Sequence, residues 1–170
     1  DRHNKGETLD RVHPDYRPFL DTYERYIKEF SPGVIESEVT VWSDTYNFAG
    51  TLDMITMFDD EAVIIDLKTG ASGVWPDVSL QLAAYARADC ILEPSGERRP
   101  MPKIDGAAAL WLRPDKFELV PVRALDDDVW AVFLALQQVA SWQRETSKGV
   151  LGPPLQPETK AQKEATGGPQ

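Results

Sequence analysis

The chain has 170 residues, 42% of them hydrophobic, which is enough for one domain with a real hydrophobic core. Its 18 Lys and Arg against 28 Asp and Glu give a formal charge of −10, which argues against non-specific nucleic-acid binding by bulk charge. A single cysteine, Cys90, excludes an intrachain disulfide framework and any four-cysteine zinc or iron–sulfur site. The chain has no apolar stretch of membrane-spanning length, and from its charged first residues no signal peptide is expected.

The first half of the chain predicts one helix followed by three strands, over residues 16–30, 34–43, 47–58 and 62–66. The helix is indicated by aromatic and aliphatic side chains that recur on one stripe, and Ser31-Pro32-Gly33 ends it. Alternating side chains indicate the first strand, and Gly50 marks a bend in the second. The third strand is almost entirely apolar, which is typical of a central strand that is buried on both faces.

The second half predicts a helix, two strands and a last helix, at about 78–92, 107–112, 117–122 and from 126 to about 144. Asp77 is the expected N-cap of the first of these helices, and Cys90 is expected to be a buried structural thiol near its end. Residues 93–105 read as a loop.

These elements predict an α/β fold with a central mixed sheet of four or five strands flanked by helices. The folded domain is expected over residues 1–146. Residues 147–170 are rich in Gly and Pro and predict an irregular or disordered tail. Three tryptophans lie in strand or helix patterns and are expected in the core, namely Trp111, Trp130 and Trp142.

The charges are unevenly spread along the chain. Residues 29–67 carry nine acids and no Lys or Arg, whereas residues 95–123 carry six basic residues against four acids. This arrangement is what a cation site facing a polyanion needs, and the alternative is a solvated acidic face.

Asp66 and Lys68 end the apolar strand and stand two residues apart, so both side chains leave the same face. The carboxylate can hold a hard divalent cation, and the lysine can position or deprotonate a water or stabilise charge on a phosphate. Asp53 on the neighbouring strand supplies a second carboxylate, which suits Mg²⁺ or Mn²⁺. The alternative is a plain Asp–Lys ion pair on a sheet face. Gln81 and Tyr85 stand four apart, so they share one face of the following helix.

Three segments stand in the order of a known set of motifs: GTLD at 50–53, IIDLKTG at 64–70 and QLAAY at 81–85. They resemble the G-x-x-D, D-x-K-T-G and Q-x-x-x-Y motifs of the RecB-like branch of the PD-(D/E)XK nuclease superfamily, in its small phage and bacterial exonuclease group. The resemblance covers about residues 34–145.

The resemblance implies a restriction-endonuclease-like core and an exonuclease that hydrolyses DNA with Mg²⁺ or Mn²⁺ in phage or bacterial recombination or repair. It implies Asp53 and Asp66 as metal ligands, together with the backbone carbonyl of Leu67, and Lys68 as the catalytic lysine. Gln81 and Tyr85 would hold the active site or the DNA backbone. The implied partners are DNA and a recombination or single-strand-binding protein in the cytoplasm of a bacterial or phage-infected cell. Relatives with an iron–sulfur cluster use four cysteines, so no cluster is expected.

Members of this branch usually carry a histidine ligand on a helix before the first motif strand. His3 and His13 lack that context, so the expectation is a chain that begins just downstream of the motif helix and lacks this one ligand. Glu38 is a candidate substitute ligand or supporting acid, and its alternative is a solvent-facing residue of an alternating strand. Without the histidine, the alternative function is a catalytically impaired module that binds DNA or a protein.

Three basic residues of the predicted loop are candidate phosphate contacts, with a solvated loop as the alternative: Arg98, Arg99 and Lys103. A second alternative function is a metal-dependent enzyme that acts on a small phosphate or nucleotide. A Gly-rich phosphate-binding loop would favour it, and the sequence has none.

Overall fold

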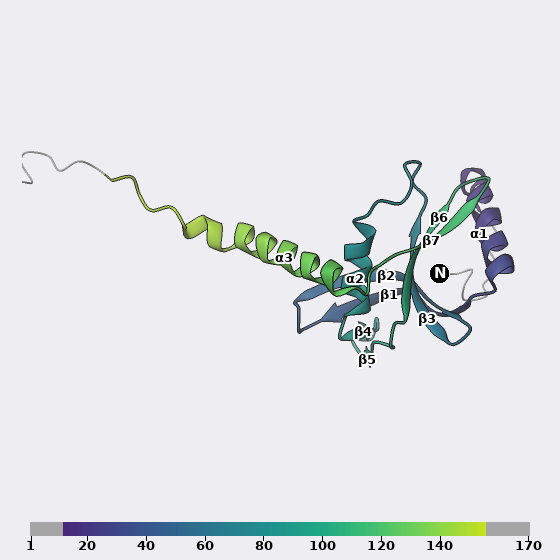
Figure 1. Cartoon of the computed structure of the whole chain (residues 1–170), viewed down its shortest axis with the longest axis horizontal. Coiled ribbons are helices and arrows are strands. Elements are labelled where there is room, and N and C mark those ends of the chain that lie inside the picture. The colour runs from purple at the N-terminus through teal and green to yellow at the C-terminus, as the bar shows by residue number, and fades with distance from the viewer. Residues whose placement is uncertain (1–11, 156–170) are drawn as a thin grey trace, which may run out of the picture. The chain divides into compact units, whose positions relative to one another are not determined.

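A computed structural model describes residues 12–155 and contains seven strands and three α-helices in that part of the chain (Figure 1). In chain order the elements are α1 (Arg17–Phe30), β1 (Gly33–Ser43), β2 (Phe48–Phe58), β3 (Glu61–Lys68), α2 (Val78–Ala86), β4 (Cys90–Leu92), β5 (Arg98–Pro100), β6 (Gly106–Leu112), β7 (Phe117–Pro121) and α3 (Asp127–Arg144), with short 3-10 helices at Pro14–Tyr16 and Thr146–Gly149. The described residues form two units that divide within α3, after Leu134.

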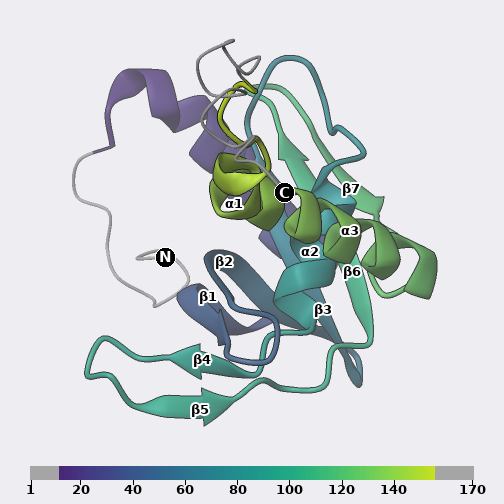
Figure 2. The ribbon, with the colours of Figure 1, turned by 90° about the vertical axis from the view of Figure 1, so that its left-hand side faces the viewer.

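The seven strands form one mixed sheet in the order β5-β4-β1-β2-β3-β6-β7. Neighbouring strands are antiparallel except for β3 and β6, which run parallel. Figure 2 shows the β4–β5 hairpin at one edge of the sheet, next to β1. The α/β fold with a mixed central sheet is therefore confirmed, with more strands than the four or five expected.

The additional strands correct two predictions. The helix predicted to run to residue 92 ends at Ala86, and Cys90–Leu92 is strand β4, which pairs with Thr40–Trp42 of β1. The predicted loop contains β5, which pairs with β4. Cys90 is buried as expected, but in a strand. Asp77 stands at the N-cap of α2, yet its side chain makes no capping hydrogen bond.

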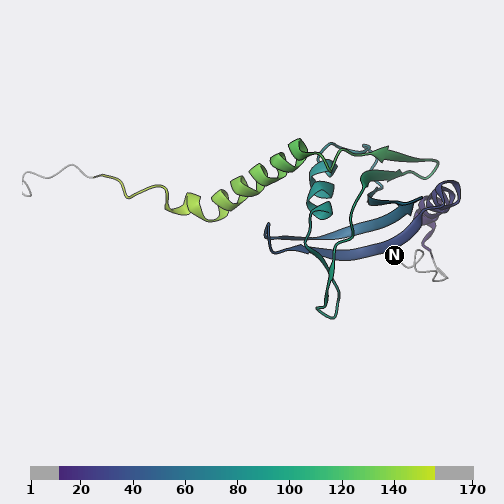
Figure 3. The same cartoon turned by 60° about the horizontal axis from the view of Figure 1, so that its bottom comes forward.

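The sheet is covered by α1 on one face and by α2 on the other (Figure 1). Successive residues of a strand point to opposite faces, so Ile64 packs in the cluster that contains Leu82 of α2, and Ile65 packs in the cluster that contains Tyr26 of α1. Figure 3 shows the long β1–β2 hairpin in blue, with α1 in purple near one end of it. A strand buried on both faces explains why β3 is so apolar, as predicted.

The predicted boundary at residue 146 stays a prediction. Residues 147–155 include the end of a short 3-10 helix, and residues 156–170 lie outside the described part of the chain. Trp142 in α3 is 50% exposed rather than buried, and Trp111 in β6 is only partly buried.

Candidate active site

Three acidic residues stand in one row across the three central strands. The register of β1 and β2 pairs Ser37 with Met54 and Val39 with Leu52, so Glu38 lies opposite Asp53. Asp66 comes directly after Ile65, the last residue of β3 that pairs with β2. The row is therefore Glu38, Asp53 and Asp66, on β1, β2 and β3.

Asp53 holds β2 against β3 at the point where their ladder ends. The last ladder pair is Met54 with Ile65. One step further, the Oδ2 atom of Asp53 accepts a hydrogen bond of 2.7 Å from the backbone N–H of Leu67. The carboxylate thus takes the place of a backbone acceptor, which fixes its position beside Asp66.

Asp66 and Lys68 form an ion pair in which Nζ of Lys68 lies 2.7 Å from Oδ2 of Asp66. The Asp66 side chain is 4% exposed and the Lys68 side chain 36%, so the lysine covers the carboxylate and reaches solvent. Apart from this ion pair, Oδ2 of Asp66 is a buried atom with no hydrogen-bond partner in the described residues. Gln81 of α2 contributes a side-chain hydrogen bond to the same carboxylate.

Burial raises the pKa values of the Asp53 and Asp66 carboxyl groups above the ordinary value for aspartate. For Asp53 the negative charge of Glu38 raises the pKa further, while the Leu67 N–H and Lys68 oppose the shift. For Asp66 the charge of Asp53 raises the pKa further, while Lys68 and Gln81 oppose the shift. Three acids facing one lysine leave uncompensated negative charge in a half-buried place.

A divalent cation fits this donor set. Carboxylate oxygens are the ligands that Mg²⁺ and Mn²⁺ prefer, and the carboxylates of Asp53 and Asp66 stand next to each other on neighbouring strands. Within residues 12–155, no group of three or more His, Cys, Asp or Glu side chains is arranged as a ready metal cage. Two neighbouring carboxylates, those of Asp53 and Asp66, could hold a cation and leave positions open for water or substrate.

Gly50 and Tyr85 are in direct contact, which links two of the sequence motifs. A Cβ atom placed on Gly50 would lie 2.6 Å from the hydroxyl oxygen of Tyr85 and 2.7 Å from its Cζ. The aromatic ring therefore occupies the space that any other residue at position 50 would need. Tyr85 in turn packs against the core cluster under α2.

This contact predicts that Gly50→Ala lowers the free energy of unfolding by about 1–3 kcal/mol, because the added methyl group displaces a packed ring. In a Tyr85→Ala background the same change should cost much less, because the ring is gone. Urea unfolding of the two single variants and the double variant measures this coupling. Gly33→Ala is the control, since its Cβ would lie at an ordinary 3.5 Å from Met57. Additive effects of Gly50→Ala and Tyr85→Ala would contradict the contact.

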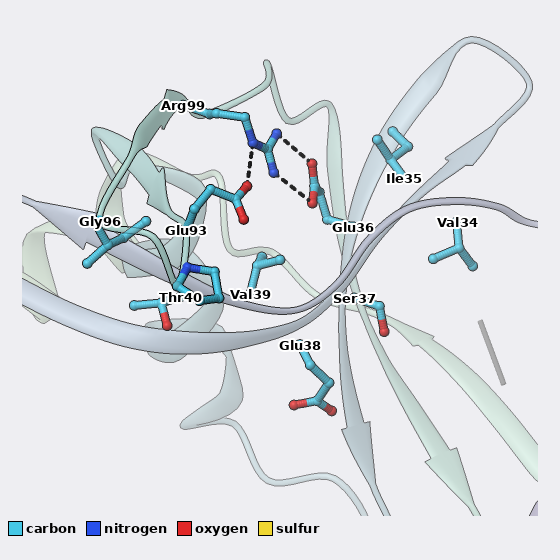
Figure 4. Close-up of a pocket in the computed structure, with 12 residues that line it drawn as sticks. Val34, Ile35, Glu36, Ser37, Glu38, Val39, Thr40, Glu93, Gly96 and Arg99 are labelled. Atoms are coloured by element: carbon cyan, nitrogen blue, oxygen red, sulfur yellow. Dashed lines mark hydrogen bonds and ion pairs between the residues drawn. The ribbon is translucent and has the colours of Figure 1, made fainter. Parts of the chain in front are cut away.

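A pocket of about 740 Å³ runs along the first half of β1, and its lining includes Glu38 but neither Asp53 nor Asp66. Figure 4 shows that Glu36 points toward Arg99 in the pocket, whereas Glu38 points away from that pair. Arg99 contacts both carboxylate oxygens of Glu36, at 2.9 and 3.1 Å, and Glu93 at 2.6 Å. Glu38 has a left-handed backbone with φ of 54°, and a bulge separates Val34 from Glu36.

The structure does not gather the predicted phosphate contacts around Asp66. Arg99 is held by Glu36 and Glu93, as described above. Arg98 forms an ion pair with Asp44, and Lys103 forms one with Asp105. Each of these cations is therefore already neutralised by a carboxylate of its own chain.

In residues 12–155, no hydrogen bond or ion pair joins a histidine to the candidate site. α1, which precedes β1, contains no histidine. His13 stands before α1, where its side chain accepts a hydrogen bond from the backbone N–H of Asp15. His3 lies outside the described residues.

Two side chains that the sequence did not single out as functional reach the turn after Lys68. Trp111 stands opposite Lys68 in the parallel pairing of β3 and β6, and its Nε1–H donates to the carbonyl of Gly70 at 2.7 Å. Arg113 lies 3.5 Å from the carbonyl oxygen of Thr69. Sequence reasoning missed them because no local pattern reveals that β6 pairs with β3.

Of three comparisons with known proteins, the one with family models identifies a family. No curated protein matches the chain. The crystal structure of SSO0001 matches with 16% sequence identity and a TM-score of 0.40, over 72% of this chain and 56% of that protein's length. No helix in residues 12–155 is both long and apolar enough to span a bilayer. The sequence model of the PD-(D/E)XK nuclease superfamily matches residues 5–164, nearly the whole chain, and so the chain belongs to that superfamily.

Proposed function

We propose that the chain is an exonuclease that hydrolyses DNA phosphodiester bonds with Mg²⁺ or Mn²⁺. The observation that carries the proposal is the row of Glu38, Asp53 and Asp66 with Lys68 ion-paired to Asp66. Membership of the nuclease superfamily supports the reaction class. The proposed setting is recombination or repair of DNA in a bacterial or phage-infected cell, with a recombination or single-strand-binding protein as partner.

Each residue of the site has a proposed role. Asp53, Asp66 and the backbone carbonyl of Leu67 hold the cation, and Glu38 supports it from the neighbouring strand. A cation bound there acts as a Lewis acid on the phosphate and makes water more acidic. Lys68 orients or deprotonates the attacking water and stabilises the charge on the phosphate through Nζ.

Gln81 and Tyr85 fix the geometry from α2. The hydrogen bond from Gln81 favours the ionised form of Asp66. Tyr85 contacts the backbone at Gly50, three residues before Asp53, and so supports the strand that presents the second carboxylate. Arg98, Arg99 and Lys103 remain candidate phosphate contacts, each of which would have to exchange its carboxylate for a phosphate.

Incubation with end-labelled linear DNA and with closed circular DNA tests the proposal. With Mg²⁺ or Mn²⁺ we expect release of nucleotides from the linear DNA, an intact circle, and no reaction after addition of EDTA. Cutting of the circle would show an endonuclease instead.

The alternative is a module of the same fold that binds DNA without cutting it. The lack of a histidine on α1 favours this alternative. Binding of linear DNA without hydrolysis in either cation would support the alternative and contradict the exonuclease.

A further inference from the structure

Within the described part of the chain, the basic segment from 95 to 123 contains a single cation that no acidic side chain neutralises. Five of its six basic residues form ion pairs with carboxylates, namely Arg98, Arg99, Lys103, Lys116 and Arg123. Arg113 is the exception among the described residues. An ion-paired cation gains little by exchanging a carboxylate for a phosphate, whereas an uncompensated one gains the full charge-assisted bond.

Arg113 is held in place by neutral groups. One Nη1–H of its guanidinium reaches the carbonyl oxygen of Thr69 at 3.5 Å. The guanidinium also lies over the ring of Trp111, 5.9 Å from its centre. Its backbone N–H closes the β6–β7 turn on the carbonyl of Lys116 at 2.8 Å. A guanidinium has five N–H donors, so most of them remain available to a ligand.

Trp111 ties this cation to the candidate active site. The register pairs Asp66 with Ala109 and Lys68 with Trp111, so Trp111 is on the sheet face that carries Asp66 and Lys68. Its indole N–H binds the carbonyl of Gly70, in the turn that directly follows Lys68. Arg113 is thereby anchored beside the catalytic lysine, on the side of the row of acids away from Glu38.

The charges on the two sides of the candidate site differ accordingly. On the β1 side, Glu38 adds a negative charge that repels phosphate, and Arg99 is held by two acids. On the β6 side, Arg113 presents a positive charge that no acidic side chain of the described residues neutralises. A DNA strand entering the site meets its favourable contacts on the β6 side.

We infer that Arg113, supported by Trp111 and the carbonyl of Thr69, binds a phosphate of the DNA backbone next to the one that is cut. The contact recognises the non-bridging phosphate oxygens and is therefore independent of base sequence. The inference rests on the proposed function and adds to it the side from which the strand is held.

Arg113→Gln tests the inference by removing the charge while keeping a side chain of similar size. We expect DNA affinity to fall about tenfold, and the slope of log K against log salt to decrease by about 0.7–0.9, because one phosphate contact is lost. Arg113→Lys should keep most of the slope, because it keeps the charge. Fluorescence anisotropy of a labelled oligonucleotide, with Ca²⁺ in place of Mg²⁺, measures both quantities.

Arg17→Gln is the matched control. Arg17 lies on α1, on the opposite face of the sheet, and forms an exposed ion pair with Asp21 at 2.8 Å. The variant has the same net charge as Arg113→Gln, so an equal loss of affinity in both would attribute the effect to bulk charge and overturn the inference. Wild-type slope and affinity in Arg113→Gln would overturn it as well.

Cleavage kinetics separate this inference from the proposed function. If the wild type cuts DNA, Arg113→Gln should raise KM about tenfold with a smaller change in kcat, because the contact binds ground state and transition state alike. If the wild type cuts DNA and Arg113→Gln has the same KM, the Arg113 contact is overturned and the proposed function is not. A wild type that neither binds nor cuts DNA would overturn both.

Discussion

Asp66→Asn should abolish binding of Mn²⁺ and slow DNA hydrolysis by at least about 10³-fold, which corresponds to about 4 kcal/mol of lost transition-state stabilisation. The change keeps the size of the side chain and removes the charge of the most buried carboxylate of the row, which is 4% exposed. Isothermal titration calorimetry with Mn²⁺ and a DNA digestion assay measure the two effects. Thermal unfolding without metal verifies that the variant folds.

Protons should compete with the cation at this site. The pKa values of Asp53 and Asp66 are both raised by burial, so the folded protein holds protons there at a pH where exposed carboxyls are ionised. Affinity for Mn²⁺ should therefore fall as the pH is lowered through these raised values, and the binding step should release protons. Titrations in buffers of different ionisation enthalpy measure the released protons.

Asp44→Asn is the control for this experiment. Asp44 has an exposed side chain that pairs with Arg98, so the same chemical change there removes a charge without touching the row of acids. It should bind Mn²⁺ like the wild type. Equal Mn²⁺ binding by the wild type, Asp66→Asn and Asp44→Asn would contradict a cation site at Asp66.

The long elements could be predicted from the sequence because each carries its own periodic signal. The stripe of α1 and the alternation of β1 need no partner to be recognised. The strands β4 and β5 have three residues each, too few for a pattern. β4 forms because β1 offers an edge with which it pairs, and β5 forms because it pairs with β4. The buried Cys90 and Ile91 fit a strand as well as the end of a helix, and pairing decided between the two.

Those residues of the candidate site that belong to a sequence motif could be predicted from the sequence. Asp66 and Lys68 could be named because they end an apolar strand two residues apart, and Asp53 because it lies on the neighbouring strand. The position of Glu38 opposite Asp53 could not be predicted, since it depends on a bulge near Ile35 and on a left-handed residue at 38. The neighbours of Arg113 could not be predicted either, because they depend on the parallel pairing of β3 with β6, two strands that lie far apart in the sequence.

Lys68→Ala should slow hydrolysis by at least about 10²-fold while leaving cation binding intact. The ammonium group touches Asp66 and reaches solvent, so it is placed to act on a water or a phosphate there. It also repels a cation held by Asp66. At a pH above the raised pKa values of both carboxyl groups, the variant should therefore bind Mn²⁺ at least as tightly as the wild type.

This combination separates a catalytic lysine from a structural ion-pair partner. A purely structural Lys68 would leave the rate unchanged in molecules that remain folded, or it would lower metal affinity and rate together through a disordered Asp66. Lys28→Ala, on the exposed side of α1, is the matched control and should match the wild type in both assays. A loss of rate with retained or tighter Mn²⁺ binding requires Lys68 to act on the reacting groups. Hydrolysis by Lys68→Ala at the wild-type rate would exclude that role.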